Sequence, residues 1–164
     1  FRKADLFQNI KIGDGELIAA VSPLGYRKLN KRFFESAMRA AIGADRRKPW
    51  SELFFYNNQN TPLDSAAAGQ YAVPLEMVRL GPSASNKQPW RVILNQGSCH
   101  FYLQRTPGYG LPGFDIQLND IGIAKCHFEL SAQEADLNGE WQILTDLDIP
   151  SGWTYVCSWV PDLS

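Results

Sequence analysis

Residues 81–94 read GPSASNKQPWRVIL, and this short stretch indicates the fold more strongly than any other part of the chain. It places two prolines, two serines and a tryptophan directly before an apolar run that is typical of a strand. It contains no Cys, His, Asp or Glu, so by itself it supplies neither a metal site nor an activated nucleophile. We therefore interpret it as a shaped loop that offers backbone, hydroxyl and amide groups.

The segments on both sides of this loop have clear local patterns. Residues 73–81 predict a short helix with Pro74 in its first turn and Gly81 at its end. Residues 90–105 alternate about an Asn-Gln-Gly-Ser sequence and predict a β-hairpin. The loop should therefore connect the end of a helix to the first strand of a hairpin.

A second helix and a last strand are expected nearer the C-terminus. The helix should begin at Asn119 or Asp120, both acceptable N-caps, and run to about Leu137. Residues 153–160 predict the strand, and its aromatic side chains should lie in the core. The helix should bury one face made of Ile121, Ala124, Phe128, Ala132 and Ala135, with Ile123 and Leu130 beside it.

The N-terminal third has its own elements. Residues 15–26 predict a buried strand followed by a turn, and residues 30–42 predict a helix that Gly43 ends. Residues 56–70 are rich in amides, Ala and Gly, and are expected to form a linker or long crossover with a short helical turn at 65–68. The mixed order of helices and strands favours an α+β fold.

Composition limits the possible classes of protein. The chain has 164 residues, of which 45% are hydrophobic and 20% charged, as in a globular domain. A net charge of −1 predicts no nucleic-acid partner, and no apolar run approaches the roughly 20 residues that span a bilayer. Three widely spaced cysteines argue against zinc or a disulfide framework and favour a cytoplasmic protein. Because the first residue is Phe1, we expect further sequence upstream.

Charge is unevenly distributed along the chain. Residues 27–48 contain eight Lys or Arg and two acids, whereas residues 115–164 contain nine acids and one Lys. The basic segment is either a solvated face or part of an anion site, and composition alone does not choose between the two.

The quoted loop resembles the nitroreductase family of flavin-dependent oxidoreductases, in which a first helix ends in A-P-S-x-x-N-x-Q-P-W. Six positions match in register, with Gly81 in place of the usual Ala: Pro82, Ser83, Asn86, Gln88, Pro89 and Trp90. Residues 120–141 are similar to the central helix of that family. Residues 15–55, with their Arg-Arg-Lys-Pro run, are similar to its C-terminal signature.

In the family this signature comes last, whereas here it comes first. The resemblance therefore implies a double-length, two-repeat nitroreductase, in which both protomers of the usual dimer are fused as a pseudo-dimer. Residues 1–56 would end the first repeat, 57–73 would be a linker, and 74–164 would form the second repeat. The implied fold is an antiparallel-rich sheet with flanking helices.

The resemblance also implies a cofactor and a reaction. FMN would pass hydride from NAD(P)H to an oxidised acceptor, either a nitroaromatic compound or a quinone. The basic segment would hold the FMN phosphate, and the loop would reach the flavin of the other repeat; the residues concerned are Arg46, Arg47, Lys48, Pro82, Ser83, Ala84 and Asn86. No residue is assigned as catalytic and no metal is implied.

Other readings remain open. The family's N-terminal Arg-rich motif would lie upstream of Phe1, and the second repeat lacks a basic signature, so this chain would hold half a site. The rest would come from a missing N-terminal half or a second chain. A non-catalytic member of the same fold without a functional flavin site is the main alternative, and a plain interaction domain is a weaker one. Pro89 and Trp90 should be core, Gln88 should bind loop backbone, and His100 and His127 should be structural or surface residues.

Overall fold

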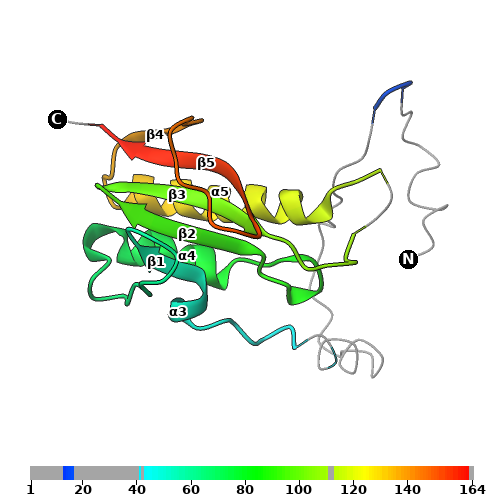
Figure 1. The fold of residues 1–164 in the computed structure, drawn as a ribbon, viewed down its shortest axis with the longest axis horizontal. Helices are drawn as coiled ribbons and strands as arrows, with labels where there is room; N and C mark the ends of the chain where they lie inside the picture. The colour runs from blue at the N-terminus through cyan, green and yellow to red at the C-terminus, as the bar shows by residue number, and fades with distance from the viewer. Residues whose placement is uncertain (1–12, 17–40, 42, 111–112, 163–164) are drawn as a thin grey trace, which may run out of the picture. The chain divides into compact units, whose positions relative to one another are not determined.

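A computed structural model describes residues 13–16, 41, 43–110 and 113–162 (Figure 1). The strand expected at 15–26 and the helix expected at 30–42 lie almost entirely outside these residues. The chain forms two compact units, Phe1–Lys31 and Arg32–Ser164. Of the first unit only a turn at 13–16 is described, in which Glu16 N–H donates to the Gly13 carbonyl at 3.1 Å.

Unit Arg32–Ser164 is built around a five-stranded sheet in the order β1-β2-β3-β5-β4 (Figure 1). Its strands are β1 (Phe54–Tyr56), β2 (Trp90–Asn95), β3 (Ser98–Gln104), β4 (Gly139–Gln142) and β5 (Trp153–Pro161). Strand β1 pairs parallel with β2, and the other three pairings are antiparallel. The sheet is therefore rich in antiparallel pairs, as expected.

The hairpin of β2 and β3 is confirmed, including its turn. Asn95 pairs with Ser98, and the two residues between them, Gln96 and Gly97, have φ values of 48° and 80°. Positive φ at both central positions is the geometry of a type I′ turn, which matches the twist of the strands it joins.

Helices α4 (Ala72–Leu80) and α5 (Ile116–Glu134) pack against each other and against one face of the sheet (Figure 1). A short helix α3 (Trp50–Leu53) precedes β1, and 3₁₀ turns η1 (Gly69–Tyr71) and η2 (Ala84–Asn86) flank α4. Helix α4 confirms the helix expected at 73–81. The mixed α/β architecture agrees with the expected α+β class.

Helix α5 begins earlier than the sequence predicts. Asp115 is its N-cap, because an oxygen of its side chain accepts the Leu118 N–H at 3.1 Å. Asn119 and Asp120 therefore lie inside the helix. At the other end the helix stops at Glu134 and Asp136 takes a φ of 56°, which breaks the helical path before Leu137.

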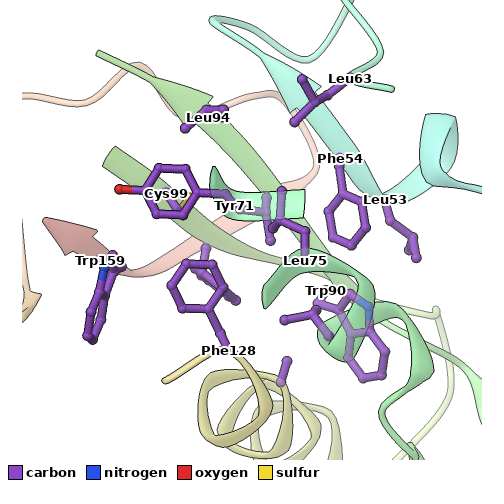
Figure 2. Packing of buried hydrophobic residues seen from close by; sticks show 14 of the residues in the cluster. Leu53, Phe54, Leu63, Tyr71, Leu75, Trp90, Leu94, Cys99, Phe128 and Trp159 are labelled. Atoms are coloured by element: carbon purple, nitrogen blue, oxygen red, sulfur yellow. The ribbon is translucent and has the colours of Figure 1, made fainter. Parts of the chain in front are cut away.

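The main core lies between the sheet and the two long helices (Figure 2). Four of the five residues expected on the buried face of α5 are buried: Ile121, Ala124, Phe128 and Ala132. Ala135 is exposed because the helix ends before it, and Leu130 is 58% exposed. Pro89 and Trp90 are buried as predicted.

The opposite face of the sheet carries a smaller apolar cluster. Phe55, Ile93 and Tyr102 are buried there, and Trp153 and Tyr155 pack against them. Alternation along β2 and β3 therefore separates two buried clusters rather than a buried face from a fully exposed one.

Residues 57–73, expected as a linker, also contribute to the main core. The chain turns back after β1, where the Leu63 N–H donates to the Phe54 carbonyl at 2.9 Å. Leu63 is 2% exposed and Tyr71 is 3% exposed, and the Tyr71 hydroxyl donates to the Gly97 carbonyl at 2.7 Å. The division of the chain into two repeats stays a prediction.

Candidate functional site

The loop between α4 and β2 adopts an unusual backbone conformation. Ser85, Asn86 and Gln88 have φ values of 45°, 54° and 48°, in the left-handed region that residues with a Cβ seldom adopt. Such residues cost about 1–3 kcal/mol each and persist only where the surroundings hold them. This loop therefore needs specific contacts to keep its shape.

Two sets of hydrogen bonds stabilise the backbone of this loop: bonds within the loop itself and a bond to α5. The Ser83 hydroxyl accepts the Gln88 N–H at 2.8 Å, and the Ser83 carbonyl accepts the Asn86 N–H at 3.0 Å. The Ala84 N–H donates to Oδ1 of Asp120 on α5 at 2.9 Å. Ser83 and Asp120 therefore fix the backbone of the turn.

Asp120 was expected as the start of a helix, but the structure gives it this second role. It is 1% exposed, and burial raises the pKa of its carboxyl group, while the Ala84 N–H opposes the shift. Its second oxygen, Oδ2, has no hydrogen-bond partner among the described residues. No signal in the sequence indicated that Asp120 contacts the loop, because this contact depends on how α5 packs against the loop.

The amide side chains of the loop bind the basic segment, residues 43–48. Asn86 Nδ2 donates to the carbonyls of Gly43 and Arg46, at 2.6 and 2.8 Å. Gln88 Oε1 accepts the Lys48 N–H at 2.8 Å, and Gln88 Nε2 donates to Asn86 Oδ1 at 3.0 Å. The prediction that Gln88 binds backbone is confirmed, and the segment it binds is distant in the sequence.

Arg47 completes this contact from the basic segment. Its Nε and Nη2 both donate to the Leu80 carbonyl at the end of α4, at 3.2 and 3.1 Å. Its Nη1 donates to the carbonyls of Ala44 and Arg46 and to Asn86 Oδ1. Each nitrogen of the guanidinium group therefore has an acceptor within the protein, and Arg47 attaches the basic segment to both α4 and the loop.

The remaining cations near the loop have fewer acceptors. Burial lowers the pKa of Lys48, and the positive charges of Arg91 and Lys87 lower it further, against the opposing effect of Glu52. Arg91 on β2 is 6% exposed, and burial lowers its pKa to about 10. Its Nη1 donates to the carbonyls of Gln88 and Trp90.

Arg91 was not among the residues that the sequence pointed to. The available signal was a charged residue within the otherwise apolar run WRVIL. Such a residue is expected to face solvent at the edge of a sheet, whereas β2 lies between two strands and buries it.

A second loop approaches the first from the end of β3. The Tyr109 hydroxyl donates to the Ser85 hydroxyl at 2.9 Å, and Lys87 Nζ lies 5.3 Å from the centre of the Tyr109 ring. Gln117 of α5 holds this loop by donating to the Tyr109 carbonyl at 2.7 Å. The site therefore has hydroxyl, aromatic and cationic groups on neighbouring loops.

The structure brings together most of the residues predicted for the site. Arg46, Arg47 and Lys48 come from the segment that the loop binds, and Asn86 touches it directly. Arg46 and Pro82 are exposed, whereas Ser83 and Ala84 are partly buried. The whole arrangement offers positive charge and polar backbone, which suits the binding of an anionic, polar molecule.

Three observations concern other kinds of site in the described part of the chain. It contains no group of three or more His, Cys, Asp or Glu side chains arranged to hold a metal ion. None of the helices described here is both long and apolar enough to cross a bilayer. Cys99, Cys126 and Cys157 are all free thiols.

The fold and loop define a mixed α/β protein with a polar loop at the junction of α4 and β2. Residues 7–132 match the model of the family described as "Putative TM nitroreductase". This match covers more than half of the chain, so the chain belongs to that nitroreductase family. No curated protein and no solved structure matches this chain.

Proposed function

We propose that this chain is part of an FMN-dependent oxidoreductase that transfers hydride from NAD(P)H to a nitroaromatic compound or a quinone. The observation that carries the proposal is the contact between the basic segment and the Asn86 loop. In a nitroreductase family member, this contact unites the two sets of residues that the resemblance assigns to one flavin site.

The chemistry of the residues fits FMN. Its phosphate is a dianion, and Lys48, Arg46 and Arg91 supply positive charge beside the loop. Pro82, Ser83 and Ala84 would contact the flavin. The bound cofactor would supply the hydride chemistry, while these residues would bind and orient it.

Arg47 and Asn86 enter this proposal as positioning residues. Their polar atoms already bond to one another and to the carbonyls of Gly43, Ala44 and Leu80. They would therefore keep the basic segment next to the loop, so that other groups can contact the cofactor.

The proposal includes the arrangement of the complete protein. The two repeats would form a fused pseudo-dimer, with residues 1–56 closing the first and 74–164 forming the second. The rest of the flavin site would come from an N-terminal half of the same protein or from a second chain. We propose a cytoplasmic location, in keeping with its three free cysteines.

One observation favours a second function. Arg47 and Asn86 use their side chains for bonds within the chain, which is how purely structural residues behave. The alternative is therefore a non-catalytic nitroreductase-fold protein that has a structural or ligand-binding role and no functional flavin site.

Flavin binding by the full-length protein distinguishes the two functions. The enzyme should bind added FMN, show flavin absorbance and oxidise NAD(P)H in the presence of a quinone. Arg47→Ala should weaken FMN binding by about 1.5–3 kcal/mol, because the basic segment would leave the loop and the cofactor would lose at least one charge-assisted hydrogen bond to that segment. FMN affinity is measured by flavin fluorescence.

Lys125→Gln is the matched control, because it also removes one positive charge but lies on α5, where its Nζ sits 4.6 Å from the Trp141 ring centre. It should bind FMN as the wild type does. A protein that stays colourless with added FMN would refute the flavoenzyme and support the alternative. Equal FMN affinity in Arg47→Ala and the wild type would refute the positioning role.

A further inference from the structure

A small polar cavity of about 70 Å³ lies on the sheet face that carries the smaller apolar cluster. Ile93 of β2 lies opposite His100 of β3, and Asn95 and Tyr102 follow two residues later along their own strands. Side chains two residues apart point to the same face of a sheet, so all four line the cavity together. The described residues around it belong to neither the Asn86 loop nor the basic segment, so this cavity is separate from the proposed flavin site.

Two chain segments form the rest of the cavity wall. The first is the turn after β1, in which the Asn57 N–H donates to the Leu94 carbonyl at 2.9 Å. The Asn58 side chain closes this turn by accepting the Asn60 N–H at 2.9 Å. The second is the segment between β4 and β5. Together the two segments contribute Asn57, Asn58, Gln59, Leu147 and Asp148.

Two buried side chains in the wall have polar atoms without partners. His100 is 5% exposed and Tyr102 is 2% exposed. Nδ1 of His100 lies 2.7 Å from the Ser158 hydroxyl, which leaves Nε2 as its other polar atom. Neither Nε2 nor the Tyr102 hydroxyl has a hydrogen-bond partner in the described part of the chain, and neither is among its fully enclosed unpaired atoms. Because buried polar groups are nearly always bonded, these two atoms indicate a cavity that holds a polar molecule.

The charge of the cavity favours a cation. Asp148 is exposed and has no ion-pair partner among the described residues, and the residues described around the cavity include no Lys or Arg. Burial lowers the pKa of His100, so its ring is neutral near pH 7. Burial, together with Tyr155 and Asp148, raises the pKa of Tyr102 to about 12, so its hydroxyl is neutral as well. The cavity therefore offers one negative charge and several neutral oxygen acceptors.

We propose that this cavity binds the ammonium group of a small primary amine. An ammonium group has three N–H donors and no acceptor, which suits the Asp148 carboxylate, the Tyr102 hydroxyl oxygen and the amide oxygens of the turn. A water molecule takes up about 30 Å³ of the liquid, so the cavity admits an ammonium group with one or two carbon atoms. The remainder of a longer amine would leave past the exposed amide side chains.

His100 would accept the third N–H through Nε2, with its own proton on Nδ1. The surrounding bonds allow this tautomer. Nδ1–H would donate to the Ser158 hydroxyl, which would donate to the Tyr155 hydroxyl 2.8 Å away. Tyr155 in turn donates to the Gln142 carbonyl at 3.4 Å. Each hydroxyl in this chain thus has an acceptor for its proton.

The first experiment titrates the full-length protein with methylammonium chloride and follows the methyl protons by saturation-transfer NMR. Sodium chloride keeps the ionic strength constant. Asp148→Asn should weaken binding about tenfold to hundredfold, because it removes a charge-assisted hydrogen bond. Asp146→Asn is the matched control, because Asp146 is an exposed acid of the same segment that does not line the cavity, and it should bind as the wild type does. Absence of binding by the wild type, or equal affinity in Asp148→Asn, would overturn the site.

Tyr102→Phe tests the buried wall. It keeps the ring in the apolar cluster and removes only the hydroxyl, so circular dichroism should show a folded protein. Methylammonium affinity should fall about twofold to tenfold, since one neutral hydrogen bond is lost. Wild-type affinity in the folded variant would contradict the proposed site. Acetate, which has the opposite charge and no donor, should not compete with methylammonium, and competition would refute a cation site.

Sedimentation velocity identifies the source of the ammonium group. If it is a lysine side chain of a second copy of this chain, methylammonium should dissociate an oligomer. An unchanged mass would assign the site to a free amine, and both results support the same chemistry. None of these measurements requires flavin. Methylammonium binding by a protein that does not bind FMN would therefore support this site and still refute the flavoenzyme.

Discussion

At the scale of single residues, His100 joins two strands and a loop through a chain of hydrogen bonds. Its Nδ1 lies 2.7 Å from the Ser158 hydroxyl, which lies 2.8 Å from the Tyr155 hydroxyl. Tyr155 in turn accepts the Leu144 N–H at 3.0 Å. His100 is 5% exposed, and burial lowers its pKa, so the folded state favours the neutral ring.

This burial predicts that stability depends on pH through His100. The unfolded chain binds a proton near pH 6.5, the ordinary value for His, while the folded protein resists it until lower pH. The free energy of unfolding should therefore fall as pH decreases from about 7 through 6.5. Urea denaturation at pH 7.5 and pH 5.5 measures the change.

His100→Gln should show a smaller fall between the two pH values than the wild type, because it lacks the buried imidazole. His127→Gln, which removes the partly exposed imidazole of α5, is the matched control and should keep most of the wild-type fall. An equal fall in His100→Gln and the wild type would contradict this account.

Individual residues show the limit of what the sequence could predict about the site. The motif pointed correctly to Gln88 as a backbone ligand, and Asn86 and the basic segment do lie in contact. Asp120 was missed because its contact with Ala84 joins segments that are distant in the sequence, and Arg91 was missed because its burial depends on β2 lying between two other strands. A motif records residue types and spacing, whereas burial depends on how the sheet is assembled.

At the scale of elements, the start of α5 combines a cap and an ion pair. Asp115 accepts the Leu118 N–H and also pairs with Arg105, whose Nη1 and Nη2 lie 3.0 and 2.5 Å from its two oxygens. The hydrogen bond from Arg105 is the largest cause of the lowered pKa of Asp115. Both side chains are partly exposed, so the ion pair should stabilise the protein less than the cap does.

Two variants separate these contributions. Asp115→Ala loses cap and pair together and should lower the free energy of unfolding by about 1–2 kcal/mol. Arg105→Ala loses the pair but keeps the cap, and should cost less than about 1 kcal/mol. Chemical denaturation near neutral pH measures both. An Arg105→Ala loss as large as that of Asp115→Ala would show that the pair, rather than the cap, starts the helix.

The elements with strong local signals were predicted well, and the short ones were not. Helix α4, the hairpin and β5 all have periodic patterns or characteristic turns. Strand β1 has three residues and is defined by pairing with β2 far along the chain. Strand β4 was not predicted. A Cβ at its Gly139 would lie 2.6 Å from the Val160 carbonyl oxygen, so glycine allows the close pairing with β5.

At the scale of the whole molecule, Phe128 connects the helices to the sheet (Figure 2). Its ring centre lies 5.4 Å from that of Phe101 on β3, 5.7 Å from Trp159 on β5 and 6.0 Å from Tyr71 on η1. It is fully buried. One side chain of α5 therefore contacts aromatic rings from several elements.

Phe128→Ala should lower the free energy of unfolding by about 3–5 kcal/mol, because it leaves a cavity among rings that cannot all move to fill it. Leu130→Ala on the same helix should change it by no more than about 0.5 kcal/mol, since Leu130 is 58% exposed. Denaturant titration gives both values. Similar losses for the two variants would contradict the central position of Phe128.

The fold class followed from the order of local patterns, because alternating helices and strands around a hairpin leave few ways to bury their apolar faces. The proposed pseudo-dimer does not follow from these local patterns. It depends on the order of motifs along the chain and on residues 17–40, which lie outside the described structure. It stays a prediction that a structure of the full-length protein would test.

The return of the chain after β1 has a consequence for self-association. Residues 61–63 run antiparallel to β1, with a bridge between Phe55 and Pro62. Proline has no N–H to offer a further strand, and its neighbours Thr61 and Leu63 already bond back to Tyr56 and Phe54. This margin of the sheet is thereby protected against the strand-by-strand addition that begins aggregation.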